Sequence, residues 1–430
     1  MIPTSRRGLL AASLAAAAAG TARGAAAQAR PTSFTVISHR VHQQVLTEGQ
    51  AGDVLNAWRE RNNASLDWVT LDLNAIHDRI FREARLSSSN VTMAYVLNTR
   101  AVPSTFSMFE PLDPYQQRDP IEDFDDFSQG MVSAFSNNGQ RYGVPVRHSV
   151  NCLHYNEAYL QERGLDRPPQ IIDELVDYAR RLTFTRADGT QVFGWGIQAD
   201  NYSDVVAIAR ACGGDLITED MRCVADQPGM VRALEIIRQL YQDGLMPRNI
   251  TAMKQNDMIT AVQNGQIAMH NFPFGRTVLF NNPRSSRFPG RFKTTYCMTS
   301  REQRERGELI ATAEFWCMMI PRNARAKDMA WSLIKEISSK ENTIRAAMNG
   351  NQPARVSAYA DPRLLASVPY AEQEARSLQQ SRVPMPAFDR SAEAKDIFVE
   401  EMQAAMLGMR TPQAAGANMA RRIRPLLPRT

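Results

Sequence analysis

The stretch RYGVPVRHSVNCLHYNEAYLQERGLDRPP, residues 141–169, joins an extended segment to a short, well-bounded helix. Four residues of the extended part favour a strand, namely Tyr142, Val144, Val146 and Val150. Pro145 cannot donate to a strand ladder, so an edge or hinge strand fits better than a central one. Asn156 is a good N-cap and Gly164 a good helix terminator, which predicts a helix over residues 157–163. We therefore expect the chain to cross here from one lobe into a second.

Five motifs follow one another through this stretch and just beyond it: Tyr142-Gly143-Val144-Pro145, Tyr155-Asn156, Gly164-Leu165-Asp166, Pro168-Pro169 and Asp173-Glu174. Their order resembles the interlobe crossing of the carbohydrate-type, maltose-binding-protein-like extracellular solute-binding proteins of ABC importers. The match departs at Gln170, where that family usually has a Thr or Ser cap.

Residues 314–355 carry a second resemblance to the same family. The predicted strand EFWCMMIP (residues 314–321) precedes an amphipathic helix, the sequence Ser-Lys-Glu-Asn and a short helix ending near Gly350. Pro353-Ala354-Arg355 then resembles the Pro-x-Arg that often marks the third crossing in that family. One departure is Ala311-Thr312-Ala313, which stands where many members carry a Gly-Gly pair. The backbone freedom that lets glycine approach a ligand closely is therefore missing at this point.

Strands and helices alternate through the first hundred residues, with strand signals at residues 34–38, 66–71 and 91–97. This alternation is typical of a parallel sheet covered by helices. Ligands of such sheets lie outside the carboxyl ends of the strands, which predicts binding loops at residues 39–44 and 95–99. The same alternation continues beyond the crossing.

The resemblance implies an α/β, two-lobe periplasmic-binding-protein fold of type II. In this fold each lobe is a mainly parallel sheet flanked by helices, and hinge crossings join the lobes. A length of 430 residues also favours more than one core. We expect an export signal over residues 1–29, an N-terminal lobe of residues 30–143 with 311–355, and a C-terminal lobe of residues 144–310 with 356–430.

The N-terminus has the pattern of an export signal. Ser5-Arg6-Arg7-Gly8-Leu9-Leu10 precedes an uncharged, alanine-rich run that ends in Ala27-Gln28-Ala29. The paired arginines and the weakly apolar run favour twin-arginine export, with an ordinary signal peptide as the alternative. No cysteine follows the cleavage pattern, so we expect a free protein in the periplasm. Loss of Arg6, Arg7 and Arg23 would lower the formal net charge from +5 to +2, and no nucleic-acid partner is predicted.

The five cysteines, Cys152, Cys212, Cys223, Cys297 and Cys317, include no CxxC pair. Their spacing is not that of metal ligands. A hairpin could bring Cys212 and Cys223 together as a disulfide in an oxidising compartment. Five buried thiols are the alternative, because free cysteine behaves as a small apolar residue.

The sequence contains no nucleophile elbow, zinc helix, phosphate loop or dinucleotide fingerprint. We therefore predict no catalytic residue, no metal site and no cofactor. Aromatic, amide and imidazole residues instead recur where loops are expected to face a common cleft, and this mixture suits sugars and polyols. These candidate ligand-binding residues are His42, Tyr95, Asn201, Tyr202, Asn271, Phe272, Phe315 and Trp316.

Three further candidates carry or can carry positive charge. Arg147 and His148 lie in the predicted crossing and Arg355 near its end, where a phosphorylated or acidic sugar would suit them. The alternative for Arg147 is an ion pair with a carboxylate across the hinge. Trp316 is predicted to be a platform for a pyranose or polyol, with a core position as its alternative.

The resemblance implies a periplasmic, monomeric solute-binding component of an ABC import system. It would capture a small, carbohydrate-like ligand by hinge closure and present it to an ABC permease in the inner membrane. Two alternatives remain open at this point: a periplasmic carbohydrate-active enzyme exported by the twin-arginine route, and a sensory binding protein that serves a membrane receptor.

Overall fold

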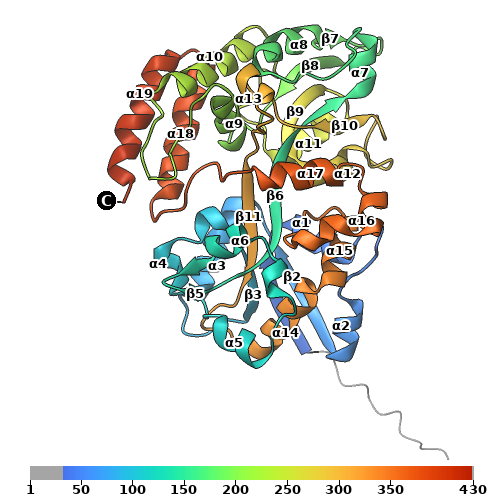
Figure 1. Cartoon of the computed structure of the whole chain (residues 1–430), viewed down its shortest axis with the longest axis vertical. Helices are drawn as coiled ribbons and strands as arrows, with labels where there is room; N and C mark the ends of the chain where they lie inside the picture. The colour runs from blue at the N-terminus through green and yellow to red at the C-terminus, as the bar shows by residue number, and fades with distance from the viewer. Residues whose placement is uncertain (1–31, 429–430) are drawn as a thin grey trace, which may run out of the picture.

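The computed structural model describes residues 32–428 and consists of two lobes, drawn one above the other in Figure 1. The predicted export signal lies outside the described residues. The chain builds most of the lower, N-terminal lobe first and then the upper, C-terminal lobe, and it passes between them along β6 (Val144–Asn156).

The N-terminal lobe alternates strands and helices, as its sequence predicts. Its first strands are β1 (Thr32–Ser38), β2 (Ala64–Thr70) and β3 (Val91–Leu97). The helices beside them are α1 (Arg40–Thr47), α2 (Asn56–Arg61) and α3 (Leu73–Ala84). Shorter elements lead to β6: η1 (Asn98–Arg100), α4 (Pro103–Phe106), α5 (Asp113–Arg118), η2 (Phe124–Asp126), α6 (Gln129–Ala134), β4 (Ser136–Asn137) and β5 (Gln140–Arg141).

Residues 39–44, expected to be a binding loop, instead begin the helix α1. His39 is its N-cap, and the ring Nδ1 accepts a hydrogen bond from the Val41 backbone N at 3.3 Å. His42, Val45 and Leu46 are buried and lie three and four residues apart, which is one face of a helix. The prediction of a loop was wrong because this spacing indicates a helix. The helix places His42 in the interior of the lobe.

The C-terminal lobe also follows the predicted alternation. Its elements after β6 are α7 (Glu157–Glu162), η3 (Ile172–Glu174), α8 (Leu175–Arg181), β7 (Phe184–Thr185), β8 (Gln191–Gly196), α9 (Ser203–Ala211), α10 (Pro228–Gln242), α11 (Gln255–Gln263), β9 (Ile267–Pro273), η4 (Phe274–Arg276), α12 (Thr277–Phe280), β10 (Phe292–Thr295) and α13 (Arg301–Glu305). Asn156 caps α7 as predicted, since its Oδ1 accepts from the Ala158 backbone N at 3.1 Å. Gly164 follows with a φ of 64°.

The chain then returns to the lower lobe and later passes back into the upper lobe. The returning elements are β11 (Ala313–Met319), α14 (Lys327–Ser338), α15 (Lys340–Met348), η5 (Val356–Ala360) and α16 (Pro362–Ser367). Helix α17 (Ala371–Gln379) lies at the junction of the lobes (Figure 1). The last elements, α18 (Ser391–Met406), α19 (Pro412–Ile423) and η6 (Arg424–Leu426), belong to the upper lobe.

The main sheet has the strand order β2-β1-β3-β11-β6-β9-β8-β7, with β10 also paired to β6. Strand β1 is parallel to β2 and β3, and β8 is parallel to β9, whereas β11 and β6 run antiparallel to their neighbours. The first half of β6 pairs with β11 and the second half with β9 and β10. One strand is therefore shared by both lobes.

Pro145 was predicted to place this strand at an edge or at a hinge; β6 lies at the hinge between the lobes, but it is not an edge strand. Pro145 lies opposite Cys317, directly beside a register shift between Trp316 and Cys317. Such an irregularity accommodates proline, because the ladder there needs no donor from it. The strand consequently stays central while it carries the crossing.

Three crossing segments meet side by side at the hinge. The Asn151 backbone N donates to the Thr312 O at 2.9 Å, and Thr312 forms a parallel bridge with Arg382. The Ala313 N donates to the Arg382 O, and the Arg382 N to the Ala311 O. The third crossing therefore lies at Arg382, not at Arg355 as the Pro-x-Arg resemblance implied.

The two hydrophobic cores give lobe boundaries that differ from the predicted ones. The N-terminal core includes Val150, Ala358 and Ala371, and the C-terminal core includes Leu153 and resumes at Met385. Residues 356–371 therefore pack with the N-terminal lobe rather than the C-terminal one, and the first boundary lies within β6. Near residue 311, Met298 packs in the upper core and Ala311 in the lower one.

All five cysteines are free thiols, so the structure contradicts the disulfide alternative. The expected hairpin exists, but it pairs Cys223 with Ile217. Cys212 instead follows helix α9 as its C-cap. Four of the five thiols are buried, and they pack as small apolar residues.

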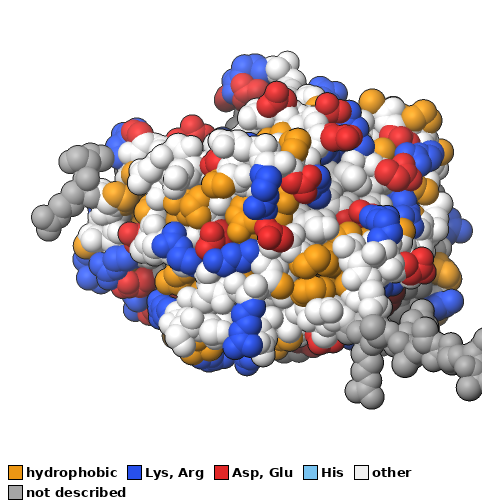
Figure 2. All heavy atoms as spheres, turned by 90° about the horizontal axis from the view of Figure 1, so that it is seen from below, with side chains coloured by type: hydrophobic (Ala, Val, Ile, Leu, Met, Phe, Trp, Pro, Cys, Tyr) orange, Lys and Arg blue, Asp and Glu red, His pale blue; other side chains and the backbone are white. Residues whose placement is uncertain are grey.

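The face seen in Figure 2 carries Lys and Arg side chains interspersed with Asp and Glu, and its hydrophobic side chains form small separate groups. Neither sign of charge dominates this face. Among residues 32–428, no helix is both long and apolar enough to span a membrane.

Candidate functional site

A cavity of about 630 Å³ lies between the lobes. The N-terminal lobe contributes His39 and the start of α3, and β6 and β11 form its floor. The C-terminal lobe contributes the segments after β8 and β9 and the starts of α9 and α11. One face of α18 completes it, including Lys395, Asp396 and Gln403. Both lobes thus supply groups to one site.

The cavity lies where the parallel strands end. His39 follows β1, Asp72 follows β2, Gln198 follows β8, and Asn271 lies near the end of β9. This position at the carboxyl ends of strands is the one that open α/β sheets use for ligands. Of the two loops expected to bind a ligand, residues 39–44 contribute His39 and Val41 to the cavity, and residues 95–99 do not line it.

Strand alternation decides which residues of the floor face the cavity. On β6 these are Arg147, Ser149 and Asn151, and on β11 they are Glu314 and Trp316. Successive side chains of a strand point to opposite faces. His148 and Phe315 consequently face away from the cavity.

The structure brings five of the predicted site residues to the cavity: Arg147, Asn201, Asn271, Phe272 and Trp316. The other six, His42, Tyr95, His148, Tyr202, Phe315 and Arg355, do not line it. His148 and Phe315 fail by the alternation just described. The His148 ring Nε2 instead contacts the Tyr359 hydroxyl at 2.6 Å.

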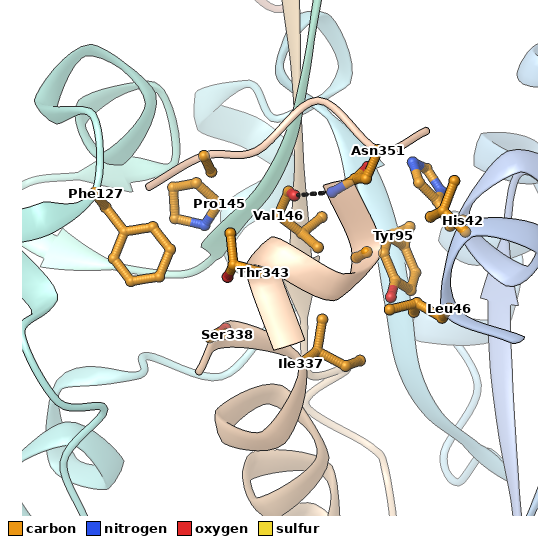
Figure 3. A pocket seen from close by; sticks show the side chains of 13 residues that line it. His42, Leu46, Tyr95, Phe127, Pro145, Val146, Ile337, Ser338, Thr343 and Asn351 are labelled. Atoms are coloured by element: carbon orange, nitrogen blue, oxygen red, sulfur yellow. Dashed lines mark hydrogen bonds between the residues drawn. The ribbon is translucent and has the colours of Figure 1, made fainter. Parts of the chain in front are cut away.

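His42 and Tyr95 lie in the interior of the N-terminal lobe (Figure 3). Their rings stack at 4.4 Å beside a space of only about 10 Å³, which Leu46, Phe127 and Val146 also line. A space of this size holds no more than about one water molecule. This correction follows from α1, which buries His42, and from β3, all of whose residues are buried.

Tyr202 and Arg355 have structural partners instead of cavity positions. The Tyr202 ring packs on Phe398, and its hydroxyl donates to Glu314 Oε1 at 3.4 Å. Arg355 is 1% exposed and donates to backbone carbonyls and to Asp126 in the lower lobe. Its expected place at the cleft rested on the third crossing, which lies elsewhere.

Trp316 lines the cavity although it is only 6% exposed. Its ring lies 5.7 Å from the ring of His77, stacked, and 4.7 Å from that of His42, edge to face. These two histidines fix the orientation of the indole. Trp316 therefore packs in the lobe and also lines the cavity, so it has features of both the core position and the ligand platform.

Several charged cavity residues were not predicted from the sequence: Asp204, Arg276, Glu314 and Lys395. Glu314 lies two residues before Trp316 on the same strand, so the alternation of side chains along a strand predicts that both face the cavity. Arg276 is the last residue of η4, which directly follows β9, and it lies four residues beyond the predicted Phe272. Lys395 has no local signal, because α18 reaches the cavity through the chain's last crossing.

The charges of the cavity are perturbed by burial. Burial, with smaller contributions from Arg276, Arg147 and His77, lowers the pKa of His39 to about 3, so this imidazole is neutral at pH 7. Burial raises the pKa of Glu314 and lowers that of Lys395, and the charge of each opposes the shift of the other. The site therefore offers neutral hydrogen-bonding groups beside a few charges.

Asp204 gives a testable pH dependence. Burial raises its pKa to about 7 from 3.8, against a smaller opposing effect of the Gln198 backbone N, which donates to the carboxylate at 3.3 Å. Between these values the folded state holds a proton that the unfolded state has lost. The free energy of unfolding should therefore fall as the pH rises from about 4 to about 7.

We expect Asp204→Asn to remove this fall, which is on the order of 2–4 kcal/mol. Urea unfolding of both proteins between pH 4 and pH 7.5 measures it. The difference in stability between variant and wild type should grow with pH across this window. Parallel pH profiles would contradict the assignment.

Among the described residues, no group of three or more His, Cys, Asp or Glu side chains could hold a metal ion. The indole of Trp316 offers an apolar face, and amides such as Asn151 and Asn271 offer donors and acceptors. Such an arrangement suits a small polar ligand with apolar CH faces.

Known proteins share this architecture. Maltose-bound MalE3 of T. maritima superposes with a TM-score of 0.78 at 22% identity, covering 92% of this chain and all of that one. An ABC transporter solute-binding protein of Agrobacterium radiobacter K84 in complex with ribitol gives a TM-score of 0.78 at 19% identity, covering 92% and 98%. These similarities show that the fold is the two-lobe periplasmic-binding-protein fold.

Two curated relatives are more limited in extent or identity. A Brucella abortus protein described as a binding protein is 25% identical over 167 residues, and the match spans 37% of this chain and 38% of the relative. The "Probable amino-acid ABC transporter periplasmic-binding protein" of Sinorhizobium fredii is 21% identical over 311 residues, 71% of this chain and 69% of the relative.

The family comparison covers the part of the sequence that builds the floor of the cavity. Residues 103–344, more than half of the chain, match the model of the bacterial extracellular solute-binding proteins. This range includes β6, β9 and β11, which form the floor and one wall of the cavity. The chain belongs to the bacterial extracellular solute-binding protein family.

Proposed function

We propose that the protein is the periplasmic solute-binding component of an ABC import system. It captures a carbohydrate-like ligand between its lobes and presents the closed form, as a monomer, to a permease in the inner membrane. No bond of the ligand is made or broken in this cycle. Hinge closure about the three crossing segments that lie side by side is the conformational change.

The observation that carries this proposal is the cavity between the lobes. It is lined from both sides, so a ligand in it contacts both lobes at once and favours the closed state over the open one. A volume of about 630 Å³ lies within the range of small-molecule sites. The family assignment and the sugar- and polyol-bound proteins of the same fold support the ligand class.

A thermal-shift screen over sugars, polyols and their acidic derivatives tests the proposal. A ligand at one hundred times its dissociation constant should stabilise the protein by about 2.7 kcal/mol. Chromatography of the recovered ligand should then show it unchanged. Turnover of the ligand would contradict a transport role, and the absence of any stabilising compound would remove the carbohydrate assignment.

We also propose that export uses the twin-arginine route. Replacing Arg6-Arg7 by Lys-Lys should leave precursor in the cytoplasm, because recognition of the pair requires guanidinium groups whereas the general pathway requires only positive charge. Fractionation of cells that express either form measures this. Normal export of the Lys-Lys variant would show that the general pathway is used.

A further inference from the structure

Two of the four arginines that the structure buries have no carboxylate partner. Arg210 pairs with Asp215 at 3.0 Å and Arg355 with Asp126 at 3.3 Å. Arg147 and Arg276 are 2% and 8% exposed, and among the described residues neither forms an ion pair. Both line the cavity between the lobes. A buried charge normally requires a counter-charge, so this pair calls for an explanation.

The protein contacts of the two guanidinium groups leave most of their donors unused. Arg147 Nη1 donates to Asn351 Oδ1 at 3.2 Å, and Arg276 Nη2 donates to Gln255 Oε1 at 3.3 Å. Both acceptors are neutral amides. Arg276 Nε is buried without any partner, and each guanidinium group carries five N–H donors.

The two arginines share one corner of the cavity. The guanidinium group of Arg147 lies beside Gly275, where a Cβ added to that residue would be 3.5 Å from Arg147 Nη2. Arg276 is the next residue along η4. Burial and the charge of Arg276 both lower the pKa of Arg147, to about 9. The positive charge of Arg276 therefore acts on Arg147.

The buried acid Glu374, whose charge would act on Arg147, does not neutralise the pair. Burial raises the pKa of Glu374 to about 8, and this effect exceeds the lowering by its hydrogen bonds and by the charge of Arg147. The carboxyl group is therefore mostly protonated at pH 7. Two like charges without a counter-ion destabilise the protein on their own. An oxyanion from outside would relieve this repulsion and fill the free donors, since arginine binds planar oxyanions with two parallel hydrogen bonds.

We propose that Arg147 and Arg276 form a subsite for an oxyanion of the ligand, which makes the ligand an acidic sugar or polyol and not a neutral one. The inference rests on the proposed binding function and narrows its ligand class. A carboxylate fits better than a doubly charged group, because Glu314, Asp396 and Glu400 also line the cavity and oppose further negative charge. The hydroxyl groups of such a ligand would meet Asn271, whose buried Oδ1 has no partner.

Calorimetric titration with matched pairs tests the subsite: D-glucuronate against D-glucose, D-galacturonate against D-galactose, and D-gluconate against D-sorbitol, all at one ionic strength. We expect at least one acid to bind about 10-fold or more tightly than its neutral counterpart. Glucose 6-phosphate is also titrated. If it binds more tightly than both glucose and the acids, the result supports the oxyanion subsite and assigns a phosphate to it.

Two outcomes overturn the inference and are distinguishable from each other. Neutral compounds that bind as tightly as their acids would leave the binding function intact and remove the oxyanion subsite. A panel in which nothing binds would overturn both. For the acid that binds, Arg276→Gln should weaken affinity by about 10- to 100-fold while changing the binding of its neutral counterpart little.

A second measurement needs no ligand. Arg276→Met should leave the melting temperature of the ligand-free protein unchanged or raise it, because an unpaired buried charge is removed. The matched control is Arg210→Met, which breaks a buried ion pair and should lower it. A loss of stability in Arg276→Met as large as in the control would show that Arg276 is a structural residue and would overturn the subsite.

Discussion

Replacing Arg355 by methionine should lower the free energy of unfolding by about 3–5 kcal/mol, because the change breaks a buried ion pair and leaves several acceptors unsatisfied. The side chain is 1% exposed, and its guanidinium group lies 4.2 Å from the ring centre of Phe127. It donates to four acceptors: the backbone carbonyls of Ser338, Glu122 and Asp123, and the carboxylate of Asp126. Methionine preserves much of the volume but none of these bonds.

Urea unfolding measures this loss. A ligand that binds the wild-type protein should bind the folded variant with nearly the same affinity. The control is Arg363→Met, which removes exposed ion pairs with Glu341 and Asp361 and should lower stability far less than Arg355→Met does. An Arg355→Met protein of normal stability and weakened affinity would return Arg355 to the binding site, where its sequence pattern first placed it.

Trp316→Ala should weaken ligand binding by about 1.5–4 kcal/mol, which is the range of aromatic residues that dominate an interface. The indole lines the cavity, and no other tryptophan does among the described residues. Stability should fall as well, at the lower end of the about 3–5 kcal/mol typical of a buried aromatic residue, because only part of the ring packs on His42 and His77.

Phe315→Ala is the matched control for Trp316→Ala. Phe315 is the preceding residue on β11, is 9% exposed and belongs to the N-terminal core, on the opposite face of the strand. Its truncation should lower stability without a comparable loss of affinity. Equal effects of the two variants on affinity would mean that Trp316 acts only through the fold.

Much of the fold can be predicted from local patterns in the sequence. The cap at Asn156 and the glycine at position 164 bound α7 as expected, and the strands β1, β2 and β3 appear where branched and aromatic residues cluster. These features depend on neighbouring residues. The position of the third crossing does not depend on neighbouring residues, because Arg382 pairs with Thr312, which is distant in sequence.

The candidate site was harder to predict, for two physical reasons. Adjacent residues on a strand face opposite ways, so Arg147 and Trp316 reach the cavity while His148 and Phe315 do not. A single helix also changes a residue's environment: α1 carries His42 into the core, and α18 brings Lys395 to the cavity from the far end of the chain. Residue type alone carries neither kind of information.

Small-angle X-ray scattering with and without ligand tests the central claim most directly, because closure of the lobes must make the molecule more compact. The compound that gives the largest thermal shift should reduce the radius of gyration, and the effect should saturate with the same concentration dependence as binding. Trp316→Ala at the same ligand concentration should remain in the extended state. Saturated binding with an unchanged radius of gyration would contradict capture by hinge closure.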